Sequence, residues 1–585
     1  MATFSFLILL ITCAWYIPTF AYPLPAPRLS LDDVPFRIRD ANATIGNSLD
    51  EIIANVAAAD DPLLTVKTST GTFAGAYNAT SGVYHWLGVP YAADTGGANR
   101  FKAPTERDVQ DADAPQDATK YGLTCPQYLT SGSKMAGGFA GIVVPLNQGE
   151  DCLSANVWVG KNVRSNTDNG AGAPVMLFLY GGSFTWGGTN NPLTDGNEVV
   201  RNHDDVIVVT VNYRINIFGF PRNPQLQSDA KGINLGLLDR DFAIDWVRDN
   251  IGAFGGDGQR ITLWGQSAGG SSADAWAFSH SGQDGLPSSD GSGVTGLIIE
   301  SGAVQGLSAF ISGNDFPAPS SSLSSWNQVA SKVGCGTAGD DAQLICMQSK
   351  AFGDLVAAID STGQNFAPTP DGKTWFSDFE VRAQKGTFAK VPMLISNNAD
   401  EGTIFGLVAN STIATGISGA LITPLVFQCP AADSAALRVS AGVPTFRAVY
   451  YGNWDDVNSG HPELATYHGS EIEMVWGSAG PTPVGLATGV YKGPTTVDVP
   501  KEEIATVAFF MKAWTSFAKD PVNGLPSQVS WPRYDPNPLS QTVAAISVNN
   551  SGTVQWQTPQ RLSCGLDNGV KNLLSQLFTI LGGWI

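Results

Sequence analysis

Strand-like and helix-like segments alternate through the central third of the chain, and this restricts the fold more than any other feature. Apolar, β-rich runs lie at 173–180, 206–213, 260–264, 296–299 and 391–395. Continuous runs of this kind fit strands that are buried on both faces. Apolar residues recur at helical spacing within 238–251 and again within 504–518. The alternation predicts an α/β fold, with a large, mostly parallel central sheet, helices on both faces and long insertions.

Length and charge limit the possible functions. At a typical ~150 residues per domain, 585 residues would allow about four domains. No internal repeat or linker divides the chain, so we expect one domain over 22–585. Lys+Arg 33 against Asp+Glu 52 give a net charge of −19, which repels nucleic acid and predicts no such partner. A 43% hydrophobic share with 15% charged residues excludes extensive disorder.

The N-terminus predicts secretion. The first twenty residues are largely apolar and uncharged, and Thr19 and Ala21 occupy the −3 and −1 positions of a cleavage site after Ala21. We therefore predict a signal peptide over 1–21 and an extracellular protein. A buried N-terminal helix is the alternative. Elsewhere no stretch approaches the ~20 apolar residues of a membrane span. The apolar tail 573–585 is interrupted by polar residues and a glycine pair, so it is only a weak lipid-anchor signal.

Cysteine usage agrees with an oxidising compartment. Loss of Cys13 with the signal peptide leaves an even number of cysteines, which suggests three disulfides. They are Cys125, Cys152, Cys335, Cys346, Cys429 and Cys564. Short loops close at the least entropic cost, which favours Cys335–Cys346 and then Cys125–Cys152, leaving Cys429–Cys564. No Cys-x-x-Cys motif or histidine cluster supports a metal site, so none is expected.

Asparagine sequons predict surface glycosylation of a secreted protein where they are exposed. The acceptors are Asn42, Asn78, Asn410 and Asn549.

A Gly-x-Ser-x-Gly pattern at 265–269 follows a predicted strand and precedes a predicted helix. In that context the pattern forms a tight turn that presents the hydroxyl of Ser267 at the strand tip. The glycines are needed because side chains would clash with neighbouring backbone. With 65 glycines in the chain, about one such match is expected by chance, so a Gly/Ser-rich loop is the alternative.

A nucleophilic serine also needs an oxyanion hole. Tyr-Gly-Gly-Ser-Phe at 180–184 directly follows another predicted strand. The backbone amides of Gly182, Ser183 and Ala268 would supply three donors. An ordinary glycine turn is the alternative.

The base and the acid should follow the serine in the order Ser, acid, His. Of the five histidines, only His461 and His468 lie far enough along the chain. His461 precedes a proline in a polar turn and reads as structural, which leaves His468 as the candidate base. Asp400 and Glu401 follow a predicted strand, and spacing alone does not choose between them.

At this point the sequence clearly resembles the type-B carboxylesterase/lipase family, which includes cholinesterases and secreted fungal carboxylesterases and lipases. The matching motifs are Gly-Val-Pro-Tyr-Ala at 88–92, Arg-Phe-Lys at 100–102, Glu-Asp-Cys-Leu at 150–153, Asn-Val-Trp at 156–158, Tyr-Gly-Gly-Ser-Phe at 180–184, Val-Asn-Tyr-Arg at 211–214, Asn-Leu-Gly-Leu-Leu-Asp at 234–239, Phe-Gly-Gly-Asp at 254–257, Gly-Gln-Ser-Ala-Gly at 265–269, Asp-Glu-Gly at 400–402 and His-Gly-Ser-Glu-Ile at 468–472. The similarity spans about 66–536, most of the mature chain.

The resemblance implies an α/β-hydrolase fold and hydrolysis of carboxylic esters through an acyl-enzyme, without a cofactor. It assigns the nucleophile to Ser267, the acid to Glu401 and the base to His468. It also implies the oxyanion amides given above and the pairs Cys125–Cys152 and Cys335–Cys346, and fungal members support Cys429–Cys564.

Two departures from the family bear on the substrate. The usual Gly-Gly-Gly is Gly-Gly-Ser at 181–183, so a Cβ enters the acyl site. The residue before the nucleophile is often Glu and is Gln266 here, which argues against choline esters.

The remaining question is which ester is the substrate. The loop between Cys125 and Cys152 is apolar, and it corresponds to the lid of the family's lipases. A loop packed on the domain is the alternative. The expected partner is a small-molecule or lipid ester, with transient contact to a lipid interface if the lid opens.

The alternative function is a non-catalytic cholinesterase-like adhesion or binding protein. Such members typically lack part of the triad, whereas this chain keeps all three residue types. A secreted glycoside hydrolase would also suit an acidic glycoprotein, but no carboxylate pair stands out from the loops.

Overall fold

The computed structural model describes residues 61–109, 115–128, 147–165, 172–223, 225–226, 233–282, 291–306, 308, 324–407, 419–458, 461–478 and 499–559. The predicted signal peptide, the sequons at Asn42 and Asn410, Cys564 and most of the predicted lid lie outside these residues.

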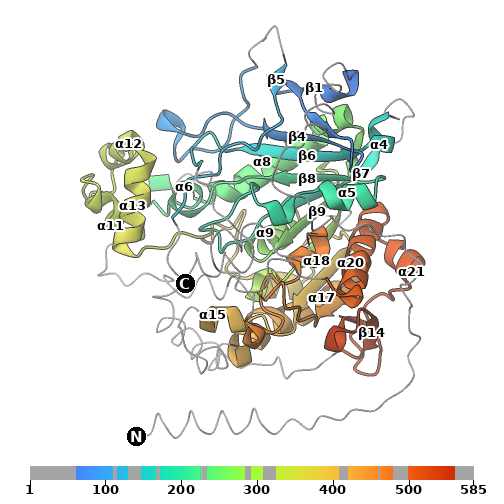
Figure 1. Ribbon diagram of the computed structural model, residues 1–585. Coiled ribbons are helices and arrows are strands. Elements are labelled where there is room, and N and C mark those ends of the chain that lie inside the picture. The colour runs from blue at the N-terminus through green and yellow to red at the C-terminus, as the bar shows by residue number, and fades with distance from the viewer. Residues whose placement is uncertain are drawn as a thin grey trace, which may run out of the picture.

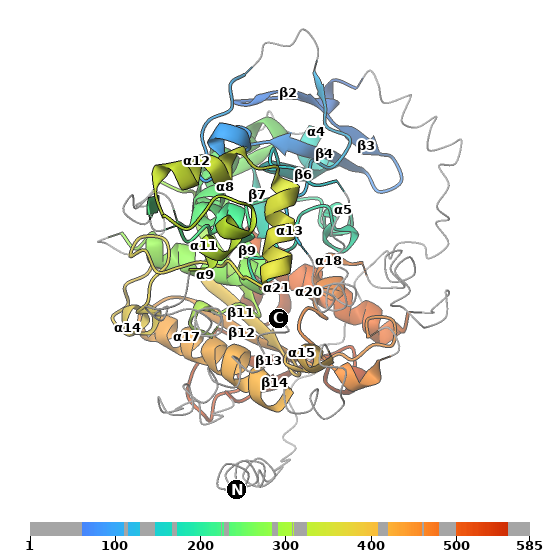
Figure 2. The ribbon, with the colours of Figure 1, turned by 90° about the vertical axis from the view of Figure 1, so that its left-hand side faces the viewer.

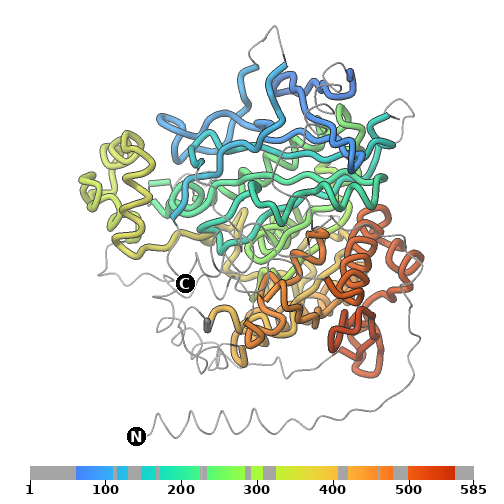
Figure 3. The backbone as a smooth tube through the Cα atoms, in the orientation of Figure 1, coloured from blue at the N-terminus to red at the C-terminus, as the bar shows by residue number. Residues whose placement is uncertain are grey.

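An 11-stranded sheet forms the centre of the molecule, in the order β14-β13-β12-β11-β10-β9-β7-β8-β6-β4-β3. Its strands are β3 (Ala76–Asn78), β4 (Val83–Pro90), β6 (Ser154–Gly160), β7 (Ala173–Leu179), β8 (Ile207–Val211), β9 (Gly256–Gln266), β10 (Val294–Glu300), β11 (Met393–Asn398), β12 (Thr445–Tyr450), β13 (Val543–Ile546) and β14 (Val554–Gln557). The neighbours from β8 to β13 run parallel, and the strands at both ends of the sheet run antiparallel. The N-terminal strands form one end and the C-terminal strands the other, which the blue and red segments of Figure 3 make visible.

A second, smaller sheet of 3 strands consists of β1 (Thr65–Thr68), β2 (Gly71–Ala74) and β5 (Gln116–Asp117) and lies near β4 of the large sheet (Figure 1). The helices are α4 (Lys161–Ser165), α5 (Asn197–Asn202), α6 (Asn216–Gly219), α8 (Leu235–Asn250), α9 (Ala268–Ser279), α11 (Ser325–Lys332), α12 (Asp341–Ser349), α13 (Phe352–Thr362), α14 (Phe379–Gln384), α15 (Thr403–Leu407), α17 (Cys429–Ser440), α18 (Ile472–Trp476), α20 (Lys501–Lys519) and α21 (Gly524–Val529).

Helices cover both faces of the large sheet. Figure 2 shows α8, α9 and α17 on one side of the strands and α5, α18 and α20 on the other. Strands β7 and β8 are buried along their whole length, which explains their continuous apolar sequences. The predicted α/β class is confirmed, and each predicted strand and helix overlaps an observed one.

The sequence predicted no membrane-spanning stretch after the signal peptide, but one helix has the length and composition of such a span. Among the described residues, Gly419–Ser440 is long and apolar enough to span a membrane by length and composition, with half of its most apolar window buried. Its residues before Asp433 include no charged side chain, which keeps this part of the helix apolar. Its C-terminal part, α17, packs against β11 and β12, as a helix of the fold does.

Two disulfides lie within the described residues, Cys125–Cys152 and Cys335–Cys346. Cys429 is disulfide-bonded as well. Arg100 connects the two loops: its guanidinium binds Glu150, near Cys152, and also donates to the carbonyl oxygen of Met347, beside Cys346.

Candidate active site

The predicted site residues gather where neighbouring parallel strands end. The register pairs Leu179 of β7 with Gly265 of β9, and Glu300 of β10 with both Gln266 of β9 and Ser396 of β11. The carboxyl ends of four adjacent strands are therefore level. In an α/β sheet this edge is where ligands bind.

Ser267 occupies a strained turn between β9 and α9. Its φ of 54° and ψ of −122° are unfavourable for a residue with a side chain. The turn is held by hydrogen bonds from Ser267 N to Glu300 O at 2.8 Å and from Ser271 N to Ser267 O at 2.9 Å. The nucleophile candidate is thus presented at the strand tip and at the N-terminus of α9, where the helix dipole favours negative charge.

The two glycines of the pattern are required by close backbone packing. A Cβ on Gly269 would lie 1.9 Å from the carbonyl oxygen of Leu179. A Cβ on Gly265 would lie 2.3 Å from the carbonyl carbon of Gly269. Helix α9 therefore touches β7 directly, backbone against backbone.

The turn after β7 lies beside Ser267. A Cβ on Gly181 would be 3.0 Å from the Cβ of Ser267. Gly182 and Ser183 both have positive φ, 110° and 55°, and Gly182 O accepts hydrogen bonds from Thr185 N and Trp186 N. Within the described part of the chain, the amides of Gly182, Ser183 and Ala268 donate to no other group. They are thus available to a ligand.

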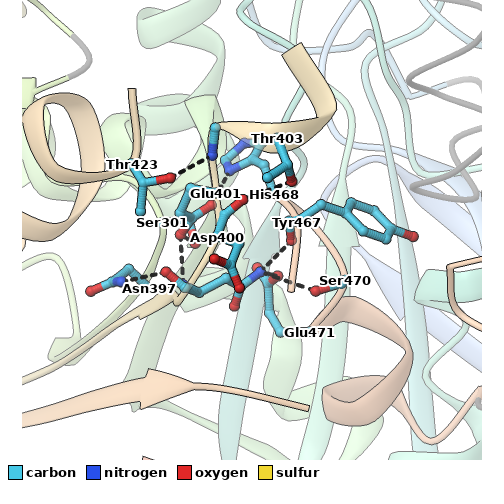
Figure 4. Close-up of polar contacts among 12 residues, drawn as sticks. Ser301, Asn397, Asp400, Glu401, Thr403, Thr423, Tyr467, His468, Ser470 and Glu471 are labelled. Carbon is cyan, nitrogen blue, oxygen red and sulfur yellow. Dashed lines mark hydrogen bonds and ion pairs between the residues drawn. The ribbon is translucent and has the colours of Figure 1, made fainter. Parts of the chain in front are cut away.

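His468 is held by Glu401. Its Nδ1 is 2.6 Å from Glu401 Oε2, and its backbone amide donates to Glu401 O at 3.3 Å (Figure 4). Glu401 is fully buried, and its other carboxylate oxygen accepts from Ser301 Oγ at 2.6 Å and from Asn398 N at 2.7 Å. The carboxylate is therefore oriented by three donors.

Ser301 connects the turn that carries Ser267 with the carboxylate of Glu401. Its hydroxyl binds Glu401, and a Cβ on the next residue, Gly302, would be 2.5 Å from Ser267 O. Ser301 itself has a positive φ of 49°.

Asp400, the other acid that spacing allowed, does not contact His468. Its backbone and carboxylate bond instead to the backbone of Thr466, and burial raises the pKa of its carboxyl. His461, the other histidine candidate, binds Glu463 in an exposed turn. The geometry therefore brings together Glu401 and His468 out of the alternatives.

Aromatic rings enclose the imidazole. The ring centroids of Phe427 and Phe405 lie 4.6 Å and 5.6 Å from that of His468. Phe427 belongs to a π-helical turn, Thr423–Gln428, whose Thr423 hydroxyl accepts from the amide of Gly402. This turn supports the segment that carries Glu401.

Two further acids are buried close to the site. Burial, followed by the negative charge of Glu401, raises the pKa of Glu471 to about 7. Glu471 accepts a hydrogen bond from the Asn398 side chain, which also donates to Tyr467 O. Burial also raises the pKa of Glu300 well above its ordinary value, although two tryptophan N–H groups donate to it.

Sequence reasoning assigned no role to Ser301, Asn398, Phe427 or Glu471. Glu471 lies within the His-Gly-Ser-Glu-Ile motif, and Asn398 lies three residues before Glu401. Ser301 and Phe427 come from distant segments with no motif of their own. Among the described residues, no group of three or more His, Cys, Asp or Glu side chains is arranged to hold a metal ion.

The mostly parallel sheet and the site at the carboxyl ends of its central strands together define an α/β-hydrolase. The family model of the carboxylesterase family matches residues 62–417, and the chain belongs to that family.

Relatives from fungi and bacteria agree with this assignment. Chlorogenic acid esterase of Aspergillus niger is 30% identical over 84% of this chain and 89% of its own length. Secreted lipase 5 of Gibberella zeae is 29% identical over 84% of this chain and 91% of its own. Para-nitrobenzyl esterase of Bacillus subtilis is 30% identical over 78% of this chain and 89% of its own length. The protein is a carboxylic ester hydrolase.

Proposed function

We propose that the protein is a secreted serine esterase with Ser267, Glu401 and His468 as its catalytic triad. The 2.6 Å contact between His468 Nδ1 and the buried Glu401 carboxylate carries the proposal. Because Glu401 occupies Nδ1, Nε2 is the nitrogen left to accept the Ser267 proton. The strained turn at Ser267 is the second support.

The reaction would proceed in two halves. His468 removes the Ser267 proton as the hydroxyl oxygen attacks the ester carbonyl, and the resulting imidazolium donates that proton to the departing alcohol. Water, activated by the same imidazole, then attacks the acyl-enzyme and releases the acid. Glu401 stabilises the imidazolium and does not itself become protonated.

The amides of Gly182, Ser183 and Ala268 are the proposed oxyanion donors. Their freedom from other acceptors supports this role. Loss of one such donor typically costs about 10²–10³ in kcat.

Secretion is proposed from the signal-like segment 1–21 and from relatives whose names include "secreted". Disulfides among the described residues fit an oxidising compartment. Asn549 is exposed and Asn78 half-exposed, so both are available for glycosylation. We further propose one domain over 22–585, since a single sheet uses strands from Ala76 to Gln557, and no nucleic-acid partner, given the charge of −19.

Some relatives are named as lipases and others as esterases. The substrate of this protein is therefore either a dissolved ester or an ester in a lipid aggregate. Most of the proposed lid lies outside the described residues. Rates measured across the solubility limit of a long-chain ester distinguish the forms. A jump above the limit indicates a lid that opens on lipid, and smooth saturation indicates an esterase of dissolved substrates.

Labelling with a fluorophosphonate tests the triad. We expect the wild-type protein and a Ser281→Ala control to be labelled, and Ser267→Ala to be neither labelled nor active. Full esterase activity in Ser267→Ala would refute the triad. Complete inertness of the wild-type protein would favour the alternative, a non-catalytic adhesion or binding protein.

A further inference from the structure

The imidazole of His468 has a carboxylate at one edge and aromatic rings beside it. Its Nδ1 lies 2.6 Å from Glu401 Oε2, and the side chain is 13% exposed. The Phe427 ring centroid is 4.6 Å from the imidazole centroid, with an angle of 38° between the two planes. For Phe405 the values are 5.6 Å and 36°. Both phenyl rings therefore meet the imidazole closer to stacked than to edge-on.

The imidazole becomes positively charged when it takes the proton of the nucleophile. Glu401 compensates this charge in the plane of the ring, at Nδ1. The face of an imidazolium carries no N–H group, so hydrogen bonds cannot stabilise it there. An aromatic face can, because its partial negative charge attracts a cation within about 6 Å of the ring centroid. Phe427 is the nearer of the two rings and is buried, so water screens this attraction little.

The Phe427 ring is held in place by the π-helical turn Thr423–Gln428. The hydroxyl of the first residue of this turn accepts from Gly402 N at 2.8 Å, and the side-chain amide of its last residue donates to Ala399 O at 3.2 Å. Both contacts lie within two residues of Glu401, so one short segment positions the ring relative to the acid. π-Helical turns are rare, and they occur frequently at functional sites.

We propose that the Phe427 ring stabilises the imidazolium of His468 through a cation–π interaction during acylation and deacylation. This inference rests on the proposed function, since it takes His468 as the base. Phe427 is a positioning residue in this scheme, because it acts on the reaction through His468. The attraction is stronger for imidazolium than for neutral imidazole, so it favours the transition state over the resting enzyme and raises kcat more than it changes KM.

Fluorinated phenylalanines at position 427 test the interaction. Fluorine withdraws charge from the aromatic face and leaves the shape of the ring almost unchanged. With 4-nitrophenyl butyrate as the probe, 4-fluoro-, 3,5-difluoro- and 3,4,5-trifluorophenylalanine should lower kcat stepwise, by about tenfold for the last of them, with KM little changed. Phe427→Leu, which removes the ring, should lower kcat at least as much.

Phe446 on β12 is the matched control. Its ring is buried and packs on that of Phe517, with centroids 6.1 Å apart and an angle of 84°. Within the described part of the chain, no arginine or lysine lies over this ring. The same fluorinated series at position 446 should therefore leave kcat unchanged.

Equal kcat across the fluorinated series at position 427 would overturn the proposal. A loss confined to Phe427→Leu would then mean that the ring acts through its shape alone. A stepwise decline of the same size at position 446 would overturn it as well. Fluorophosphonate labelling of Ser267 separates the two hypotheses: a labelled, active protein whose kcat ignores fluorination refutes only this inference, whereas an unlabelled, inert wild type refutes the proposed function.

Discussion

Buried carboxylates lie in two different environments in this protein. In one region they face arginines: Asp239 binds the backbone amide and guanidinium of Arg214, and Asp274 on α9 binds Arg438 on α17. All four side chains are almost completely buried. These ion pairs connect residues that are 25 and 164 positions apart in the sequence.

Around His468 and the helices that follow, the buried acids have no arginine or lysine partner within the described residues. They are Glu300, Glu471, Glu473 and Glu503. Burial is the largest cause that raises the pKa of each of the four glutamates, and charges of neighbouring acids add to it. Arginine-paired acids thus stabilise the fold through charge, while burial favours the neutral form of the four glutamates.

The largest effect is expected where an arginine-paired acid is neutralised. Asp239→Asn leaves the Arg214 guanidinium buried without its counter-charge, so the free energy of unfolding should fall by about 3–5 kcal/mol in urea titrations. Asp245→Asn, which breaks an exposed pair with Arg248, should change it by less than about 1 kcal/mol. Equal effects of the two variants would contradict the structural role of the buried pair.

The second prediction concerns Glu503, one of the four buried glutamates. Burial, together with Asp456, raises the pKa of Glu503 to about 9. Between the ordinary carboxyl pKa and about 9 the folded protein keeps a proton that the unfolded chain releases, so stability falls as pH rises through this interval. Glu503→Gln should match the wild type near about pH 4 and be more stable by roughly 3 kcal/mol near about pH 7.

Glu502→Gln is the matched control, because Glu502 is the neighbouring residue and is exposed. Glu502→Gln should not show the gain in stability that is expected of Glu503→Gln near about pH 7. A pH-independent difference between wild type and Glu503→Gln would show that Glu503 is ionised in the folded state.

Glu401 lies between the two groups, since neutral donors and His468 hold it instead of an arginine. Ser301→Ala removes one of its three donors and should lower kcat about tenfold, with KM little changed. Ser301→Gly removes the same hydroxyl while relieving the positive φ at this position. The two variants should therefore lose the same activity, and full kcat in both would exclude a positioning role for the hydroxyl.

The smallest effect is expected at Glu471. Because burial and the charge of Glu401 raise the pKa of Glu471 to about 7, its ionisation falls within the working range and next to the active centre. Glu471→Gln should remove one ionisation from the profile of kcat/KM against pH, changing the rate by less than about tenfold from about pH 5 to about pH 9. An identical profile in wild type and variant would contradict this.

Local patterns were enough to predict much of the molecule. The apolar runs that became β7, β8, β9, β10 and β11 are nearly continuous, because strands buried on both faces admit few polar residues. The turn at Ser267 was predictable because its glycines are adjacent in sequence to the strand and the helix they join. The motifs together then indicated the family, which the comparisons confirm.

Other features depend on contacts that no local pattern encodes. Asp400 and Glu401 are neighbours in one turn, and residue spacing could not tell which would face His468. Ser301 and Phe427 reach the site from distant segments of the chain. The protonated state of Glu503 depends on what surrounds it in the folded protein.

The contact between Gly269 and the carbonyl oxygen of Leu179 has a consequence for engineering. Since no side chain separates α9 from β7 there, the spacing between the serine turn and the Gly-Gly-Ser turn is set by main-chain atoms alone. Repacking the hydrophobic core elsewhere should alter stability while leaving that spacing almost unchanged. A single methyl group added at position 269 would instead push the two turns apart. Directed evolution should therefore tolerate substitutions among the residues that line the site far better than a substitution of Gly269.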